Sequence, residues 1–172
     1  MPTSSPHTLD RFFSGTTSQK IEAMDKLFTR NGQKLKSDKA VLASLALLKE
    51  YEAALSEQMT TMNMDSLCCS CAGEAGGGCC SGYMEANSDV LLLLMNRLYG
   101  VTVARQHNRA EDCCFLGSRG CTLPVKPMFC LNYNCSHIPD QATAAEMKTL
   151  EQLAGQILTE QTRLETLLIH LL

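Results

Sequence analysis

Two long stretches of the chain repeat hydrophobic residues every three or four positions, as one face of an amphipathic helix does. The apolar positions of the first stretch, which begins after Ser37-Asp38, are Val41, Leu45, Leu48, Tyr51, Leu55, Met59 and Met62. Those of the second, which begins near Thr143, are Met147, Leu150, Ala154, Ile157, Leu164, Leu168 and Leu171, with Gln161 as a polar member. Each stretch predicts a long helix, and we expect the two helices to pack antiparallel against each other.

Two shorter helices are predicted in addition to the long ones. Ser18 is a candidate N-cap for the first, which is expected to stop at Asn31-Gly32. Its apolar residues are Ile21, Met24, Leu27 and Phe28. Ser88 is a candidate N-cap for the second, which ends at Gly100. Because this second helix is apolar on nearly every side, we expect it to be buried.

The fold class that follows is mainly α, with one domain. We expect a flexible N-terminal arm over residues 1–17, with at most a short turn at Leu9 to Phe13. Residues 18–172 are predicted to form a small helical bundle, in which the long antiparallel helices flank an irregular cysteine-rich insert at 66–139. The glycines and prolines of that insert predict loops.

The C-terminal end of the last predicted helix carries more apolar surface than one stripe provides. The residues concerned are Leu167, Leu168, Leu171 and Leu172. They predict either a homodimer through the long helices or a wide face toward the core of one chain.

Charge and hydropathy exclude several classes of partner. The 172 residues carry a net charge of −3 and no long basic run, so we expect no nucleic-acid backbone as partner. The longest apolar run, Val90 to Met95, is far shorter than the roughly 20 residues that cross a bilayer, so no membrane contact is expected. The N-terminus lacks the basic and apolar regions of a signal peptide, which predicts a cytoplasmic protein.

All ten cysteines lie between Cys68 and Cys135, in two groups separated by the short buried helix. In a reducing compartment, clustered cysteines indicate metal binding rather than disulfides. Cys68 and Cys71 have the spacing at which two sulfurs reach one ion. The candidate metal ligands are Cys68, Cys71, Cys79, Cys80, Cys113, Cys121, Cys130 and Cys135. We also expect this part of the chain to depend on its metal for folding.

The identity of the metal stays open at this point. All-sulfur ligation suits both zinc and iron–sulfur clusters. The large number of thiolates favours an iron–sulfur cluster. Cys69 and Cys114 are either further ligands or buried cysteines that do not bind metal. His137 lies two residues after Cys135 and is more simply interpreted as a surface histidine.

The order of these residues resembles the YkgJ-type cysteine-cluster family. The matching positions are Cys68, Cys71, Cys79, Cys80, Cys113, Phe115, Leu116, Gly120, Cys121, Leu123, Lys126, Pro127, Cys130, Tyr133 and Cys135. That family is described as zinc- or iron-chelating and includes the cluster region of flagellin lysine N-methylases. The resemblance covers the middle of the chain and not the flanking helices.

Three functions are consistent with this pattern. The first is a redox or metal-handling accessory protein whose thiolates bind an iron–sulfur cluster or zinc. The second, by analogy with the methylase relatives, is an enzyme that modifies proteins with support from the cluster. The third is a helical interaction module in which zinc has a structural role.

Overall fold

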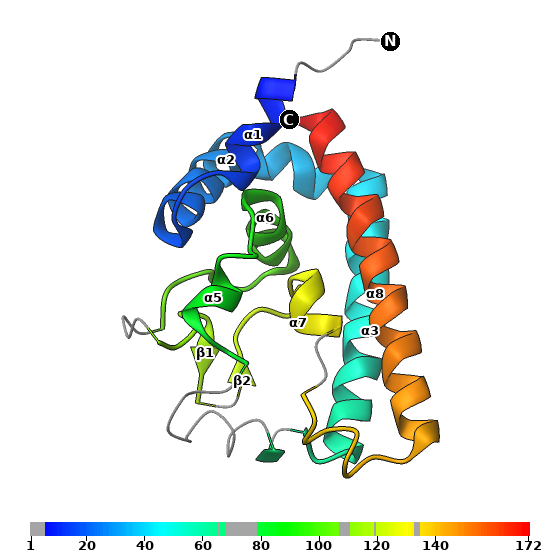
Figure 1. Ribbon diagram of the computed structural model, residues 1–172. Helices are drawn as coiled ribbons and strands as arrows, with labels where there is room; N and C mark the ends of the chain where they lie inside the picture. Colours follow the sequence, from blue (N-terminus) through cyan, green and yellow to red (C-terminus); the bar gives the residue numbers. More distant parts are fainter. Residues whose placement is uncertain (1–5, 65, 68–78, 107–110, 119, 133–134) are drawn as a thin grey trace.

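The two long helices form as predicted and lie side by side along one edge of the molecule (Figure 1). The computed structural model describes residues 6–64, 66–67, 79–106, 111–118, 120–132 and 135–172. Its elements are α1 (Pro6–Phe13), α2 (Thr17–Ser37), α3 (Lys39–Thr61), α5 (Gly82–Glu85), α6 (Val90–Tyr99), β1 (Leu116–Gly117), β2 (Gly120–Cys121), α7 (Met128–Asn132) and α8 (Ala144–Leu171). The expectation of a mainly α fold is therefore confirmed.

Helices α3 and α8 are antiparallel, as polar contacts at both ends of the pair show. Ser44, near the start of α3, donates its hydroxyl to the carboxylate of Glu160 in the second half of α8. Gln58, near the end of α3, donates to the carbonyl oxygen of Glu146 in the first turn of α8, at 3.3 Å. The predicted apolar seams face inward between these contacts, and Gln161 is buried with them.

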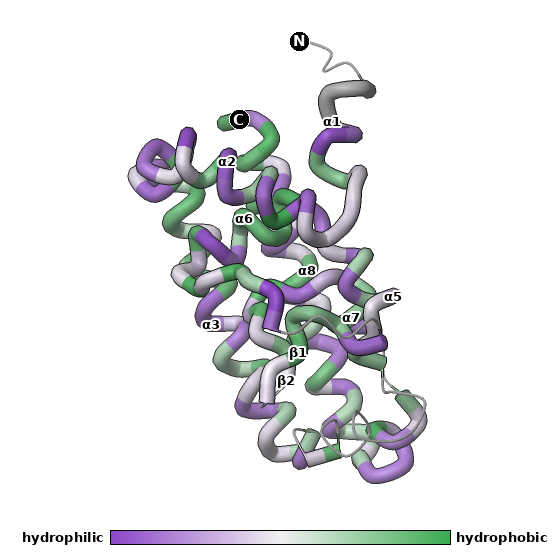
Figure 2. The backbone as a smooth tube through the Cα atoms, turned by 90° about the vertical axis from the view of Figure 1, so that its left-hand side faces the viewer, coloured by the Kyte–Doolittle hydropathy of each residue, from purple (hydrophilic) through white to green (hydrophobic). Residues whose placement is uncertain are grey.

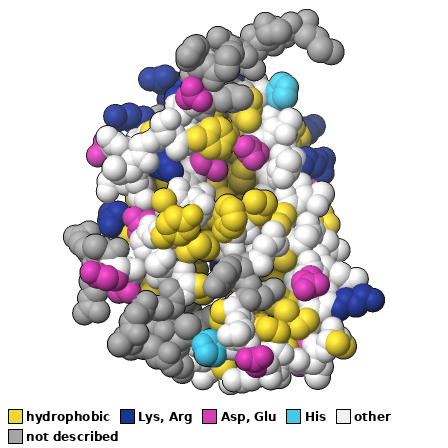
Figure 3. Space-filling view, in the orientation of Figure 1, with side chains coloured by type: hydrophobic (Ala, Val, Ile, Leu, Met, Phe, Trp, Pro, Cys, Tyr) yellow, Lys and Arg dark blue, Asp and Glu magenta, His cyan; other side chains and the backbone are white. Residues whose placement is uncertain are grey.

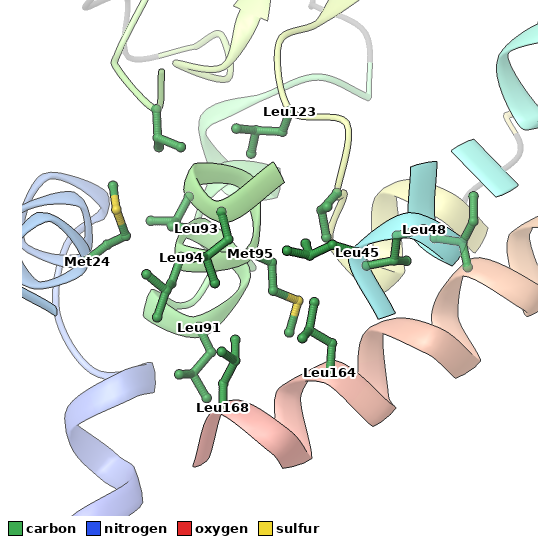
Figure 4. Packing of buried hydrophobic residues seen from close by; sticks show 14 of the residues in the cluster. Met24, Leu45, Leu48, Leu91, Leu93, Leu94, Met95, Leu123, Leu164 and Leu168 are labelled. Carbon is green, nitrogen blue, oxygen red and sulfur yellow. The ribbon is translucent and has the colours of Figure 1, made fainter. Parts of the chain in front are cut away.

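Helix α6 occupies the centre of the core (Figure 4). Met24 of α2, Leu45 of α3 and Leu164 of α8 surround it. In Figure 2 the tube of α6 has mainly hydrophobic colours, whereas α3 and α8 alternate between the two. Seven of its ten residues are buried, which confirms the prediction of a buried helix.

The ends of α6 follow ordinary capping chemistry. Asp89 rather than Ser88 is the N-cap, and its carboxylate accepts a hydrogen bond from the Leu92 N–H at 2.9 Å. At the other end, Gly100 adopts the left-handed conformation with φ of 114°. That conformation favours glycine, so the predicted stop is confirmed.

The predicted stop at Asn31-Gly32 is wrong, because α2 continues to Ser37. Asn31 donates its side chain to the Leu27 carbonyl of the same helix. Gly32 is buried against the ring of Phe28, where an added Cβ would lie 3.3 Å from ring carbons. The glycine thus provides close packing instead of a helix end.

The chain turns between α2 and α3 at one residue. Asp38 is the C-cap of α2 and the N-cap of α3, and its carboxylate accepts from the N–H groups of Ala40 and Val41 at 2.9 and 3.0 Å. The prediction that the long helix starts at this residue is confirmed. At the other end of α2, the N-cap is Thr16, which forms a capping box with Gln19.

The N-terminal and C-terminal segments lie near each other at one end of the molecule (Figure 1). Residues 6–13, within the segment predicted as a flexible arm, form α1, and the side chain of Phe12 is buried in the core. Leu168 is fully buried, and Leu171 and Leu172 pack against the same core. The apolar C-terminus thus contributes to the core of one chain, and the homodimer stays a prediction.

The cysteine-rich insert contains more regular structure than the predicted loops. Strands β1 and β2 form an antiparallel hairpin in which Leu116 pairs with Cys121. Helix α7 follows and lies beside α8. Among the helices described, none is both long enough and apolar enough to span a membrane.

Candidate metal centre

A backbone contact joins the two cysteine groups. The Cys113 N–H donates to the Cys80 carbonyl oxygen at 3.0 Å, and the Gly82 N–H donates to the Glu111 carbonyl at 3.1 Å. Ser81 and Asp112 form an antiparallel bridge between these two hydrogen bonds. The Cys79-Cys80 pair therefore lies beside Cys113, although more than thirty residues separate them in the sequence.

Two local elements bring further thiols to the same place. The Leu116 N–H donates to the Cys113 carbonyl at 2.9 Å, and the hairpin that follows pairs Leu116 with Cys121. Helix α7 carries Cys130, whose N–H donates to the Pro127 carbonyl at 2.9 Å.

Five thiols from these elements are close enough to influence one another's ionisation. We call them the thiol cluster, and its members are Cys79, Cys80, Cys113, Cys121 and Cys130. Cys121 interacts electrostatically with three of the others. Electrostatic interactions thus link five of the eight predicted ligands.

The adjacent cysteines Cys79 and Cys80 form a hydrogen-bonded pair. The hydrogen bond from Cys80 lowers the pKa of the Cys79 thiol to about 6, although burial acts in the opposite direction. The same hydrogen bond raises the pKa of Cys80, and burial adds to this effect. The pair therefore favours one thiolate that accepts a hydrogen bond from one thiol.

Two other members of the cluster, Cys113 and Cys130, resist ionisation. Burial raises the pKa of Cys113 to about 11, and nearby Cys121 adds to the increase. Cys130 is exposed as a residue, but partial desolvation of its thiol raises its pKa to about 12, with repulsion from Cys121 and Cys113 as further causes. Several thiolates at one place repel one another, and a bound cation is the ordinary means by which proteins compensate for this.

Cys114 has different surroundings from its neighbour Cys113. Its side chain is fully buried among core residues. Burial and a hydrogen bond to the carboxylate of Glu85 raise its pKa to about 12. Of the two roles left open for this residue, the structure favours that of a buried cysteine that does not bind metal.

The remaining predicted residues divide into two groups. Cys135 is half-buried and packs against the hydrophobic core, and His137 is exposed in the turn that follows. Cys68, Cys69 and Cys71 lie outside the described residues. The seven described cysteines are free thiols.

Sequence reasoning missed the polar residues that support the cysteine-bearing loops. The amide of Asn96, on α6, donates to the Val125 carbonyl at 2.7 Å and accepts from the Val125 N–H at 3.0 Å. Gln161, on α8, donates to the Lys126 carbonyl at 3.0 Å. Each is a polar residue within an apolar pattern, and this signal predicts a buried side chain with specific hydrogen-bond partners.

The donors suit a soft or borderline metal, because the cluster consists of thiols alone. Within the described part of the chain, no three His, Cys, Asp or Glu side chains stand close enough to form a complete metal site. A complete site therefore needs side-chain movement within the thiol cluster, or ligands from outside the described residues.

Comparison with known proteins identifies no relative of this chain. No family model matches the chain, and no curated protein or solved structure matches it significantly. The resemblance to the YkgJ-type family stays a prediction that rests on the residues named above.

Proposed function

We propose that this chain binds a metal ion or an iron–sulfur cluster through thiolates from its two cysteine groups, as a metal-handling or redox accessory protein. The proposal rests on the thiol cluster, which the contact between Cys80 and Cys113 assembles from distant parts of the sequence. The remaining ligand candidates are Cys68, Cys71 and Cys135.

The exposure of two members argues against a purely structural role for these cysteines. A cysteine that serves only as a small apolar residue is usually buried. Cys114 fits that description, whereas Cys121 and Cys130 are exposed. Exposed thiols that converge with three others are better explained by chemistry at sulfur.

Metal analysis of protein purified without oxygen tests the proposal. We expect bound iron with visible sulfide-to-iron absorption, or bound zinc without it. Bound iron would support the redox role, and zinc would support the metal-handling or interaction role. The absence of stoichiometric metal from anaerobic protein, and of uptake on titration with Zn²⁺ or Fe²⁺, would contradict the proposal.

Cysteine variants test the ligand set. Cys113→Ser and Cys130→Ser should each lower the metal content, because a hydroxyl is a poor ligand for such metals. Cys114→Ser is the matched control, since its hydroxyl still reaches Glu85 and its side chain is buried in the hydrophobic core. Equal loss of metal in all three variants would show that the assignment is wrong.

A further inference from the structure

The backbone that carries Cys113, Cys121 and Cys130 is attached to the helical core by contacts between protein groups. Both polar backbone atoms of Val125 are hydrogen-bonded to the side chain of Asn96, at 2.7 and 3.0 Å, in a buried contact. Buried polar groups with good partners fix a loop in one position, because the loss of either partner is costly.

A second attachment lies earlier in the insert, at Cys114. The carboxylate of Glu85 accepts a hydrogen bond from the Cys114 N–H at 2.6 Å. The same carboxylate forms an ion pair with Arg105 at 3.2 Å. This contact ties the turn after Cys113 to α5, which directly follows the Cys79-Cys80 pair.

Hydrophobic side chains complete the attachment. Phe115, Leu123 and Val125 are almost fully buried in the core. In Figure 4, Leu123 points toward α6. The backbone segments that carry the thiol cluster, which we call its frame, are thus held by hydrophobic packing, as the helices are.

The cluster is also open on one side. Cys121 and Cys130 are exposed, and the two residues before Cys130 on α7, Met128 and Phe129, are about half exposed at 54% and 55%. Figure 3 shows hydrophobic side chains, a class that there includes cysteine, across the middle of one face of the molecule.

We propose that the frame of the thiol cluster is built before metal arrives, so that the protein loads and releases its metal reversibly without unfolding, and that Asn96 is a positioning residue for this site. The inference rests on the proposed function. It replaces the expectation that the cysteine-rich part needs its metal in order to fold. Metal binding then draws the exposed thiols together on a backbone that is already in place. A competing thiol in solvent can reach the bound metal.

A structural zinc site behaves differently. Such a site is closed, and the polypeptide around it unfolds when the metal is removed. Here the hydrogen bonds of Val125 and the burial of Phe115 involve protein groups alone, so we expect them to remain after the metal leaves. The two cases therefore differ in the stability of the metal-free protein.

The experiment compares the protein with and without metal under anaerobic, reducing conditions. Metal is removed with a chelator, and backbone amide exchange is followed in residues 111–132. We expect slow exchange at the Val125 N–H in the metal-free protein, and full recovery of binding when Zn²⁺ is added back. Loss of protection throughout this range would overturn the inference while leaving metal binding intact. Failure of the untreated protein to bind metal would refute the proposed function.

The role of Asn96 is tested by affinity. Asn96→Leu keeps the size of the side chain but leaves the buried Val125 N–H and carbonyl without partners. We expect roughly a 10-fold weaker affinity for Zn²⁺ in chelator competition, as for other residues that orient ligands. Asn31→Leu is the control, because the hydrogen bond of Asn31 in the described part of the chain is to the carbonyl of Leu27 in its own helix.

To separate an effect on stability from an effect on ligand position, the Zn²⁺ affinity of both variants is measured under conditions in which circular dichroism shows that they are folded. Equal Zn²⁺ affinity for Asn96→Leu and the unmodified protein would overturn the positioning role. Should Asn96→Leu fail to fold, Gln161→Leu removes the neighbouring hydrogen bond to Lys126, and the same comparison applies.

Discussion

The ammonium group of Lys20 is buried in the structure and donates a hydrogen bond to the Ser88 carbonyl at 2.9 Å. It also donates to the Ala86 carbonyl at 3.0 Å. These two contacts join α2 to the turn that leads into α6, the central helix of the core. The carboxylate of Asp89, in the same turn, is stabilised electrostatically by Lys20 although burial raises its pKa.

Replacement of Lys20 should therefore destabilise the fold. Lys20→Met retains the aliphatic part of the side chain but leaves two carbonyl groups without their donor. We expect the free energy of unfolding to fall by about 1–3 kcal/mol. Urea denaturation followed by circular dichroism measures the change.

The matched control is Lys26→Met, an exposed position on the same helix. Its effect should stay within about 0.5 kcal/mol, as for most surface substitutions. Equal stability of the two variants would mean that the contacts of Lys20 contribute nothing net.

The pH dependence of stability should show contributions of opposite sign from two glutamates of α8. Burial, and repulsion from Asp89, raise the pKa of Glu165 above its ordinary value of 4.5. Hydrogen bonds from Thr143 lower the pKa of Glu146 below the same value.

The sign for each group follows from proton binding. The folded protein binds the Glu165 proton more tightly than the unfolded chain, so stability falls as the pH rises above 4.5. The folded protein binds the Glu146 proton less tightly, so its contribution is present above 4.5 and is lost as the pH falls.

Glutamine variants separate these contributions. Unfolding free energies between about pH 4 and pH 7 should decline less with rising pH in Glu165→Gln than in the unmodified protein. For Glu146→Gln, the unfolding free energy should instead rise less with pH than in the unmodified protein, over a range that extends down to about pH 3 because the pKa of Glu146 is lowered. Identical pH profiles for the two variants would contradict both assignments.

The sequence predicted the parts of the fold that depend on short-range patterns. The seam from Val41 to Leu55 and the seam from Leu150 to Leu168 specify the buried faces of α3 and α8, because a helical repeat has one apolar side. Helix α6 was likewise predicted, since its apolar run ends at Gly100.

Errors arose where long-range packing outweighed a local signal. Gly32 indicated a helix stop, but the ring of Phe28 covers it and the helix continues. For the candidate site, the cysteines were evident from their clustering. The pairing of Cys80 with Cys113 was not, because it depends on a backbone hydrogen bond between distant segments.

The last prediction concerns the hydrogen bond between Ser44 and Glu160, which joins α3 to α8 within the core. Both side chains are buried, and Arg163 also contacts the same carboxylate at 3.6 Å. Ser44→Ala should lower the free energy of unfolding by about 1–3 kcal/mol, because the carboxylate loses a buried donor. Glu160→Gln should be milder, since an amide oxygen still accepts from the hydroxyl. Glu160→Leu removes the acceptor, so the double variant of Ser44→Ala and Glu160→Leu should lose less than the sum of its two single losses. Strict additivity in urea denaturation would show that this contact does not couple the helices.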